Sequence, residues 1–545
     1  MRCRFPFLLP LAAAVLFLGC SDYRKLHESV LKQLRTAPDS SAIIVLDHDT
    51  LRAPGMVRCW YSLRNNRLSW SNKRILLPQA DTLLAILSSA EQEGLSPEKY
   101  HLADIKKRIQ ELEQNRKTKK YPLVKKFSEL DILMSDGLLL LAFHLDRGVS
   151  VSPSITRQFQ NGDSLAELMR SVDSNRISTI FRKIAPQHQL YAGLREMLAT
   201  CRSLLRSGGW GLITPGTALK LGSGGSRVEE LRKRLQQSVD LDSDAASSIE
   251  LFNSDLEQAV RKFQHRHGVG PSGIADSLTQ VMLNVPVEKR IEQISVSMER
   301  LRQMPRSLGQ THIRINIPDF MLVIDSCGVE VVSMKVVVGL KEWQTPLFST
   351  SMTQILFNTP WVCPTHILLA EIKNYILADT NYLRVNKMKL LRNDDNSEVD
   401  QHSIRWNEIN ERTLYFYLKQ WSYPQNIMGQ IKFIIPNPQD IYIHDTPYRE
   451  DFPKRLRMAS HGCIRVEKPD ELAAYLLRNE KGWSRSRIDT VAKRIEERAL
   501  QLSPSIPAHI VYLTAWKDSG GFAHFREDVY GLDSVFLATL PINRK

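Results

Sequence analysis

Apolar residues in the first two hundred positions recur at intervals of three and four. Leu83 and Ile86 show this spacing, and the run 136–145 is apolar on most sides. An interval near 3.6 residues is typical of helices, and a helix that is apolar all round is buried. We therefore expect residues 21–206 to form a helical scaffold domain, with His144 packed in its core rather than bound to a ligand.

A second helical unit follows a glycine-rich break at residues 207–209. We expect residues 217–285 to form this small domain. His265 and His267 stand two positions apart at the end of a predicted helix, so their side chains point to different faces, which argues against a metal site. The pattern predicts three short helices, at 228–237, 255–265 and 278–283.

The interval between apolar residues changes from about 3.6 to two after a connecting helix predicted over 286–307. Ile313, Ile315 and Ile317 alternate with polar residues, which is the pattern of a strand with one buried face. Further strands are predicted at 320–325, 329–338, 355–357, 432–435, 441–443 and 509–515.

These strands predict a β-rich domain, a mixed sheet or sandwich, over residues 308–518. Helical and loop residues interrupt it, so we expect 366–428 to form an inserted lid. Residues 519–545 form a tail in which we identify no chemistry. The predicted fold class is therefore multidomain α+β.

The first twenty residues have the composition of an export signal. A short basic start precedes the apolar run 5–18, whose 14 residues fall short of the ~20 that a spanning helix needs. The run ends at Cys20, so residues 1–20 are typical of a signal with a lipoprotein box, which would make Cys20 the lipidated first residue. Phe17 stands where such boxes usually carry Leu, which leaves plain cleavage or an uncleaved anchor open.

Length and charge narrow the function classes. The 545 residues predict two to four domains, and a hydrophobic share of 43% excludes a disordered chain. The net charge of +14 fits a nucleic-acid binder, a membrane-surface protein or a protein that faces an acidic polymer. Because an exported protein rarely meets nucleic acid, the export signal favours the cell wall or a membrane surface as the binding partner.

Chemistry concentrates between His444 and Cys463. His444 ends a predicted strand, and 15 residues separate it from Ser460, which begins Ser-His-Gly-Cys. A thiol is a good nucleophile only as thiolate, and a nearby imidazole can take its proton. Gly462 permits a tight turn whose backbone N–H groups can hold an oxyanion. We expect the remaining cysteines after Cys20 to be small buried apolar residues: Cys59, Cys201, Cys327 and Cys363.

The pattern His-x15-Ser-His-Gly-Cys resembles the signature of the L,D-transpeptidase family, whose catalytic domain is of the YkuD type. The runs 429–438 and 344–361 strengthen this resemblance. The segment 259–268, Ala-Val-Arg-Lys-Phe-Gln-x-x-His-Gly, resembles the peptidoglycan-binding domain of bacterial wall enzymes. With its helical scaffold, the chain resembles the long, multidomain Gram-negative type of these enzymes, and the resemblance covers most of residues 130–535.

The resemblance implies a role for each site residue. Cys463 is the nucleophile and His444 the general base, although His461 competes for that role on sequence alone. Ser460, His461 and Gly462 support the oxyanion site. Candidate substrate-binding residues are Arg465, Tyr442 and Trp361, for which a structural ion pair and core packing remain equal alternatives.

The resemblance also implies the reaction. A tetrapeptide stem of peptidoglycan would acylate the cysteine and release D-Ala, and an amine of a second stem would then form a 3→3 cross-link. No cofactor or metal is required, and we expect a monomeric, periplasmic protein with a lipid anchor in the outer or inner membrane. The alternatives are a carboxypeptidase, an enzyme that attaches proteins to the wall, and a non-catalytic lipoprotein that tethers membrane to wall.

Overall fold

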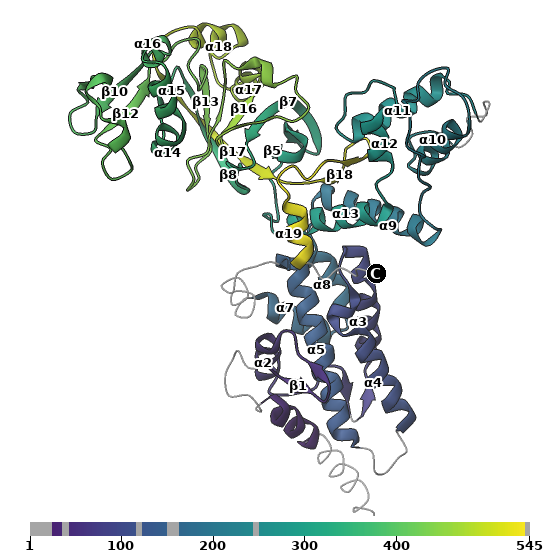
Figure 1. Cartoon of the computed structure of the whole chain (residues 1–545). Helices are drawn as coiled ribbons and strands as arrows, with labels where there is room; N and C mark the ends of the chain where they lie inside the picture. Colours follow the sequence, from purple (N-terminus) through teal and green to yellow (C-terminus); the bar gives the residue numbers. More distant parts are fainter. Residues whose placement is uncertain are drawn as a thin grey trace, which may run out of the picture.

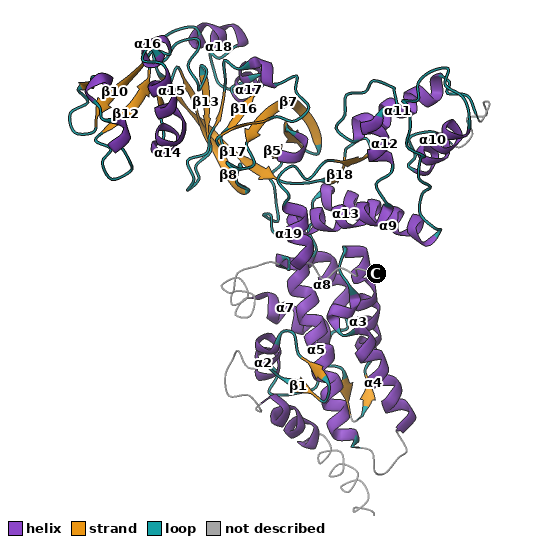
Figure 2. Cartoon of the chain, in the orientation of Figure 1, coloured by secondary structure: helices purple, strands orange, loops and turns teal. Residues whose placement is uncertain are grey.

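The computed structural model shows three lobes that meet near the middle of the molecule (Figure 1). One lobe is helical and holds the described residues between 24 and 184, one is a small helical module, and one is rich in strands (Figure 2). The predicted export signal and Cys20 lie outside the described residues. The structure describes residues 24–34, 43–72, 74–115, 122–149, 163–242 and 250–539.

The first lobe is built around one long helix, α5 (Leu123–Arg147), which is buried along most of its length, as its apolar run predicts. His144 lies on α5 with its Nδ1 3.0 Å from the hydroxyl of Tyr100, and burial lowers the pKa of the ring to about 3. The surrounding elements are β1 (Val45–Leu46), β2 (Asp49–Thr50), α2 (Pro54–Leu63), β3 (Ser71–Asn72), β4 (Ile75–Leu76), α3 (Pro78–Ser89), α4 (Leu102–Asn115), α7 (Asp163–Asp173) and α8 (Ile177–Ile184). The next helix, α9 (Gln189–Arg206), packs instead in a separate core with residues 287–301.

Two buried carboxylates of α5 hold the early strands and turns against the helix. Asp131 accepts hydrogen bonds from the backbone N–H groups of Ser69 and Trp70, both at 2.8 Å. Asp136 accepts from Arg52 at 2.9 Å and from Ala53 at 2.8 Å. Backbone donors that would otherwise be orphaned inside the lobe are thus satisfied by side chains.

The small module is a three-helix unit with its own core. The side chains of Asn253 and Asp276 cap the second and third helices by accepting a backbone N–H from Leu256 and Thr279. A connecting helix, α13 (Val287–Arg302), leads from the module to the third lobe. The helices are α10 (Ser226–Gln237), α11 (Ser254–Arg266) and α12 (Ser277–Leu283).

The third lobe contains a nine-stranded sheet that is barrel-like, because β6 and β7 also pair with each other. The order of strands is β15-β7-β16-β14-β13-β8-β17-β5-β6. The bounds are β5 (Thr311–Asn316), β6 (Met321–Ser326), β7 (Val329–Gly339), β8 (Phe348–Phe357), β13 (Ile431–Ile434), β14 (Ile443–His444), β15 (Met458–Ser460), β16 (Ile464–Val466) and β17 (Arg498–Val511). Helices α17 (Pro469–Leu476) and α18 (Arg485–Ala492) cover its core.

The residues inserted into this lobe form a unit with a separate core and a four-stranded sheet in the order β11-β10-β12-β9. Its helical part includes a π-helical turn, η4 (Leu368–Ile372). The other elements are β9 (Trp361–Val362), α14 (Thr365–Ile367), α15 (Lys373–Ala378), α16 (Tyr382–Val385), β10 (Met388–Arg392), β11 (Glu398–Val399) and β12 (Phe416–Gln420).

The predicted tail returns to the centre of the molecule. It contributes β19 (Ala523–Phe525), which pairs with β18 (Ala515–Lys517), and α19 (Leu532–Thr539). Asp533 makes a buried ion pair at 2.5 Å with Arg300 of the connecting helix and accepts a hydrogen bond from Thr514 at 2.6 Å. Across the part of the chain that the structure describes, no helix is both long and apolar enough to cross a membrane.

Replacing Asp136 with Ala should destabilise the helical lobe by about 3 kcal/mol, because two buried backbone donors lose their acceptor at roughly 1–3 kcal/mol each. The measurement is urea unfolding followed by hydrogen exchange in peptides that cover 123–147. Asp104→Ala is the matched control, since that side chain is 44% exposed. Equal stability of the two variants would contradict this account of α5.

Candidate functional site

The sheet places the predicted catalytic residues on one face. His444 on β14 lies opposite Arg465 of the parallel strand β16 and opposite Lys432 of the antiparallel strand β13. Paired residues of neighbouring strands project to the same side of a sheet. The next residues along these strands, Phe433, Ile443 and Ile464, are fully buried in the core on the opposite side.

Cys463 directly precedes β16 and continues the alternation, so its side chain shares the face of Arg465. The backbone N–H of Ile464 donates to the carbonyl oxygen of Tyr442 at 2.9 Å, and the backbone N–H of Tyr442 in turn donates to the Cys463 thiol. The thiol therefore lies beside Tyr442 and diagonal to His444 across two adjacent strands.

His444 is a neutral, buried imidazole. Its side chain is 3% exposed, and burial lowers its pKa to about 3 against the opposing effect of the Asp445 and Met428 carbonyl oxygens. Nδ1 lies 2.5 Å from the Asp445 carbonyl oxygen, which accepts the ring proton and leaves Nε2 as the basic nitrogen. No hydrogen bond joins this ring to the Cys463 thiol among the described residues, and such contacts often tighten only when substrate binds.

Ser460 fixes the turn that carries the cysteine. Its hydroxyl donates to the Cys463 carbonyl oxygen at 2.5 Å and accepts the backbone N–H of Gly462 at 3.2 Å. Gly462 has a φ of +109°, a region that favours glycine. Because Ser460 already engages the Gly462 N–H, the backbone N–H groups of His461 and Cys463 are left as the candidate oxyanion donors.

His461 faces the inserted unit rather than the sheet. Its Nε2 lies 2.8 Å from Oε2 of Glu371, a residue of the π-helical turn η4. Its ring is 5.6 Å from the ring of Trp343, which stacks on His366 of α14 at 5.2 Å. This carboxylate contact favours a supporting role for His461 and leaves His444 as the candidate base. The motif alone does not reveal Glu371, because it lies 92 positions before Cys463.

Arg465 has the predicted structural ion pair, with Nη1 3.3 Å from Asp451. Its guanidinium lies 5.4 Å from the ring of Tyr448, and its Nε is buried without a hydrogen-bond partner. Asp451 also binds Lys454 at 2.6 Å.

The two aromatic residues predicted to line a substrate groove differ in position. Trp361 is only 9% exposed and belongs to the core of the inserted unit, so the groove role predicted for it is not supported and core packing accounts for it. Tyr442 is half-buried on the catalytic face. Its ring centroid lies 3.5 Å from the ammonium of Lys432.

Lys432 is a site residue that sequence reasoning missed. Burial lowers its pKa, and its charge acts on the Cys463 thiol. Burial raises the pKa of that thiol, while the Tyr442 backbone and the positive charges of Lys432 and Arg465 oppose the rise. The sequence Gly-x-Ile-Lys-Phe does not mark this lysine as a site residue. Only the strand register, which pairs Lys432 with His444, shows that it lies beside the base.

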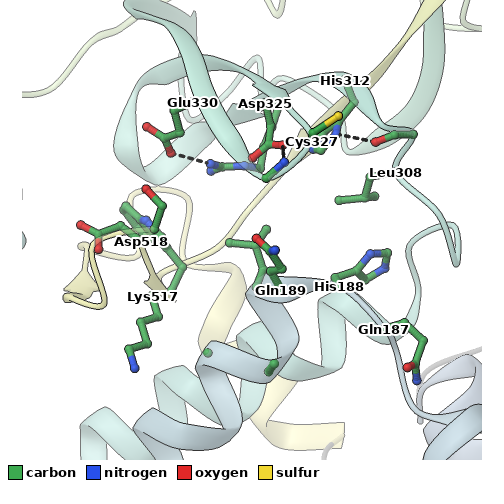
Figure 3. A pocket seen from close by; sticks show the side chains of 18 of the residues that line it. Gln187, His188, Gln189, Leu308, His312, Asp325, Cys327, Glu330, Lys517 and Asp518 are labelled. Carbon is green, nitrogen blue, oxygen red and sulfur yellow. Dashed lines mark hydrogen bonds and ion pairs between the residues drawn. The ribbon is translucent and has the colours of Figure 1, made fainter.

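A polar cavity of about 730 Å³ lies elsewhere, between the start of α9 and the turn that joins β6 to β7 (Figure 3). None of the candidate site residues lines it. Its wall includes Cys327, which is exposed at a turn, so the prediction that this cysteine is buried is wrong. Cys201 and Cys363 are buried as predicted, and Cys59 is half-buried.

Three parts of the chain match known protein families. Residues 310–488 match the L,D-transpeptidase catalytic domain. Residues 224–283 match the family described as "Putative peptidoglycan binding domain", and residues 56–198 match a scaffold domain. The three matches follow the strand-rich lobe, the small module and the helical lobe.

A curated protein of Haemophilus influenzae, named "Putative L,D-transpeptidase", is 31% identical over 242 residues, which are 44% of this chain and 48% of that protein. The chain therefore spans about half the length of this relative. Solved L,D-transpeptidase structures from Xylanimonas cellulosilytica and Stackebrandtia nassauensis are 14% and 12% identical, with TM-scores of 0.17 and 0.21. Each alignment covers 55% of this chain, and 99% and 97% of the solved chains. Scores this low carry no information about this chain's fold.

Replacing Lys432 with Met should raise the pKa of the Cys463 thiol, because a nearby positive charge favours the thiolate. We expect alkylation of Cys463 at pH 7 to slow about fivefold, and the rising limb of its pH profile to move to higher pH. The measurement is the rate of iodoacetamide labelling at this site between pH 5 and 9, followed by mass spectrometry.

The control is Lys335→Met, a half-exposed lysine of the same sheet whose ammonium lies 3.7 Å from Glu467. His444 titrates near pH 3 and adds no limb in this range. An unshifted profile in Lys432→Met would show that the lysine does not act on the thiol.

Proposed function

Because this chain carries an L,D-transpeptidase catalytic domain, a scaffold domain and a peptidoglycan-binding domain, we propose that it forms 3→3 cross-links between peptidoglycan stem peptides. The observation that carries the proposal is the juxtaposition on one sheet face of a thiol, a neutral buried imidazole and two cations: Cys463, His444, Lys432 and Arg465.

In the first half of the reaction, the Cys463 sulfur attacks the carbonyl carbon of the third residue of a donor tetrapeptide. His444 takes the thiol proton at Nε2, and the N–H groups of His461 and Cys463 stabilise the oxyanion. The bond to the terminal D-Ala then breaks, and the proton held by His444 passes to its leaving amine. A thioester between the donor peptide and Cys463 remains.

In the second half, the side-chain amine of a diamino acid on another stem attacks the thioester carbonyl. His444 accepts a proton from this amine, the carbon–sulfur bond breaks, and an amide joins the two third residues. The sulfur leaves as thiolate and can be reprotonated by His444. The positive charges of Lys432 and Arg465 stabilise the thiolate both when it attacks the donor and when it leaves the thioester.

Electrostatics support an anionic substrate at this face. Arg465 keeps one buried donor without a partner, and its guanidinium is well suited to the carboxylates of stem peptides. The net charge of +14 favours attraction to the acidic polymers of the cell wall. We place the protein in the periplasm as a monomer anchored through Cys20, with the small module bound to peptidoglycan.

The full chain mixed with a defined tetrapeptide stem should yield free D-Ala and a 3→3 dimer, and Cys463→Ala should yield neither. Chromatography with mass spectrometry of the products measures both. Cys327→Ala is the matched control, because this exposed thiol lies outside the site, and it should retain full activity. Release of D-Ala without dimer would overturn the cross-linking proposal in favour of a carboxypeptidase.

Glu371→Gln should lower the rate of acylation about five- to tenfold, because the carboxylate is the contact through which the inserted unit holds His461 beside the cysteine. Acylation can be followed by intact mass, and hydrogen exchange over 458–466 should rise in the same variant. Glu408→Gln, an exposed change in the same inserted unit, serves as the control. Unaltered acylation and exchange would show that His461 is positioned without Glu371.

A further inference from the structure

A second cavity lies where the three lobes meet. It has a volume of about 290 Å³, at the lower end of the roughly 300–1,000 Å³ typical of small-molecule pockets. Its wall combines α10 and α11 of the small module with α9, the connecting helix α13 and the hairpin β18–β19, which share one central core. Three arginines from three of these helices line it: Arg234, Arg266 and Arg290.

Arg234 is 2% exposed, and no carboxylate among the described residues forms an ion pair with it. Its Nε donates to the carbonyl oxygen of Leu283 at 2.9 Å, and its guanidinium lies 3.8 Å from the ring of Trp210. Its Nη1 is buried without a hydrogen-bond partner. A buried donor of this kind is costly unless something in the cavity accepts from it.

Arg290 is a second buried cation, and its hydrogen-bond partners within the described part of the chain are neutral groups. It is 5% exposed and donates to the side chain of Gln293 at 2.9 Å and to the Met282 carbonyl oxygen at 3.2 Å. Its guanidinium also lies 4.5 Å from the ring of Phe525. Burial lowers its pKa to about 9, as expected for a charge without a counter-ion.

Among the described residues, one carboxylate bonds to this arginine cluster, and it pairs with Arg266. Asp240, 3% exposed, accepts two hydrogen bonds from Arg266, one of them at 2.8 Å from Nε. Lys517 and Glu196, also in the wall, pair with each other. Among the described residues of this cavity, three buried guanidinium groups thus share one acid, which leaves two positive charges uncompensated.

We propose that this cavity binds a small organic oxyanion, with a carboxylate or phosphate head between Arg234 and Arg290. Guanidinium groups recognise both heads through paired N–H donors. The remaining wall is apolar and would hold a short hydrocarbon body, through Met197, Leu204, Phe263 and Phe525. Because the wall joins the small module to α9, α13 and the hairpin, the ligand would stabilise the junction between these elements.

Calorimetric titration of the full chain tests this directly, with hexanoate, acetate and inorganic phosphate as probes against chloride at matched ionic strength. We expect saturable binding, with hexanoate at least tenfold tighter than acetate if the head is a carboxylate, and phosphate tighter than acetate if it is a phosphate. Arg234→Gln should weaken binding at least tenfold. Arg261→Gln, an exposed change on the same module, should leave binding unaltered.

A readout on the wild-type chain covers the case in which Arg234→Gln fails to fold. Cys201 lines the cavity, so a saturating probe should slow its alkylation at least fivefold, while the exposed Cys327 serves as the internal control. Absence of saturable binding by all three probes would overturn the proposal. Equal binding by Arg234→Gln, or equal alkylation of Cys201 with and without the probe, would also overturn it.

Discussion

The parallel pairing of β14 with β16 is the constraint on which the site depends. The two strands are neighbours in the barrel, and their register sets His444 beside Arg465 and Cys463 beside Tyr442. Side chains alternate strictly along a strand, so a slip of one residue would move the thiol and the imidazole to opposite faces. The same slip would also turn the isoleucine of the displaced strand, Ile443 or Ile464, out of the core in which both are fully buried. The apolar core therefore fixes the catalytic geometry.

His461 and Glu371 connect the cysteine loop to the inserted unit. The sheet supplies nucleophile and base, while the inserted unit reaches the cysteine loop through one carboxylate and one stacked pair of rings, Trp343 on His366. A unit with its own core can shift as a body without disturbing the sheet. The catalytic residues thus lie on the sheet, while the unit that could control substrate access to them has its own core.

Much of this arrangement was predictable from local sequence. The apolar periods predict the helical lobe and the strands, and the Ser-His-Gly-Cys turn with a preceding His predicts the reactive pair. What the local pattern does not reveal depends on contacts between distant segments. Lys432 matters only because the register places it opposite His444, and Trp361 is an ordinary core residue of a unit whose fold the pattern does not specify. Cys327 lies in the turn between two predicted strands, with a φ of +54°, and its exposure there shows that a lone cysteine is not buried by its residue type alone.

The buried ion pair between Arg300 and Asp533 can form only late in translation. The two residues are 233 positions apart, so roughly 10–50 s of translation at 5–20 residues per second separate their emergence from the ribosome. Until Asp533 arrives, the closed connecting helix would bury a guanidinium without its acid, which is unfavourable. The lobes can therefore mature one by one while the chain grows, but their final docking waits for the last helix to be made.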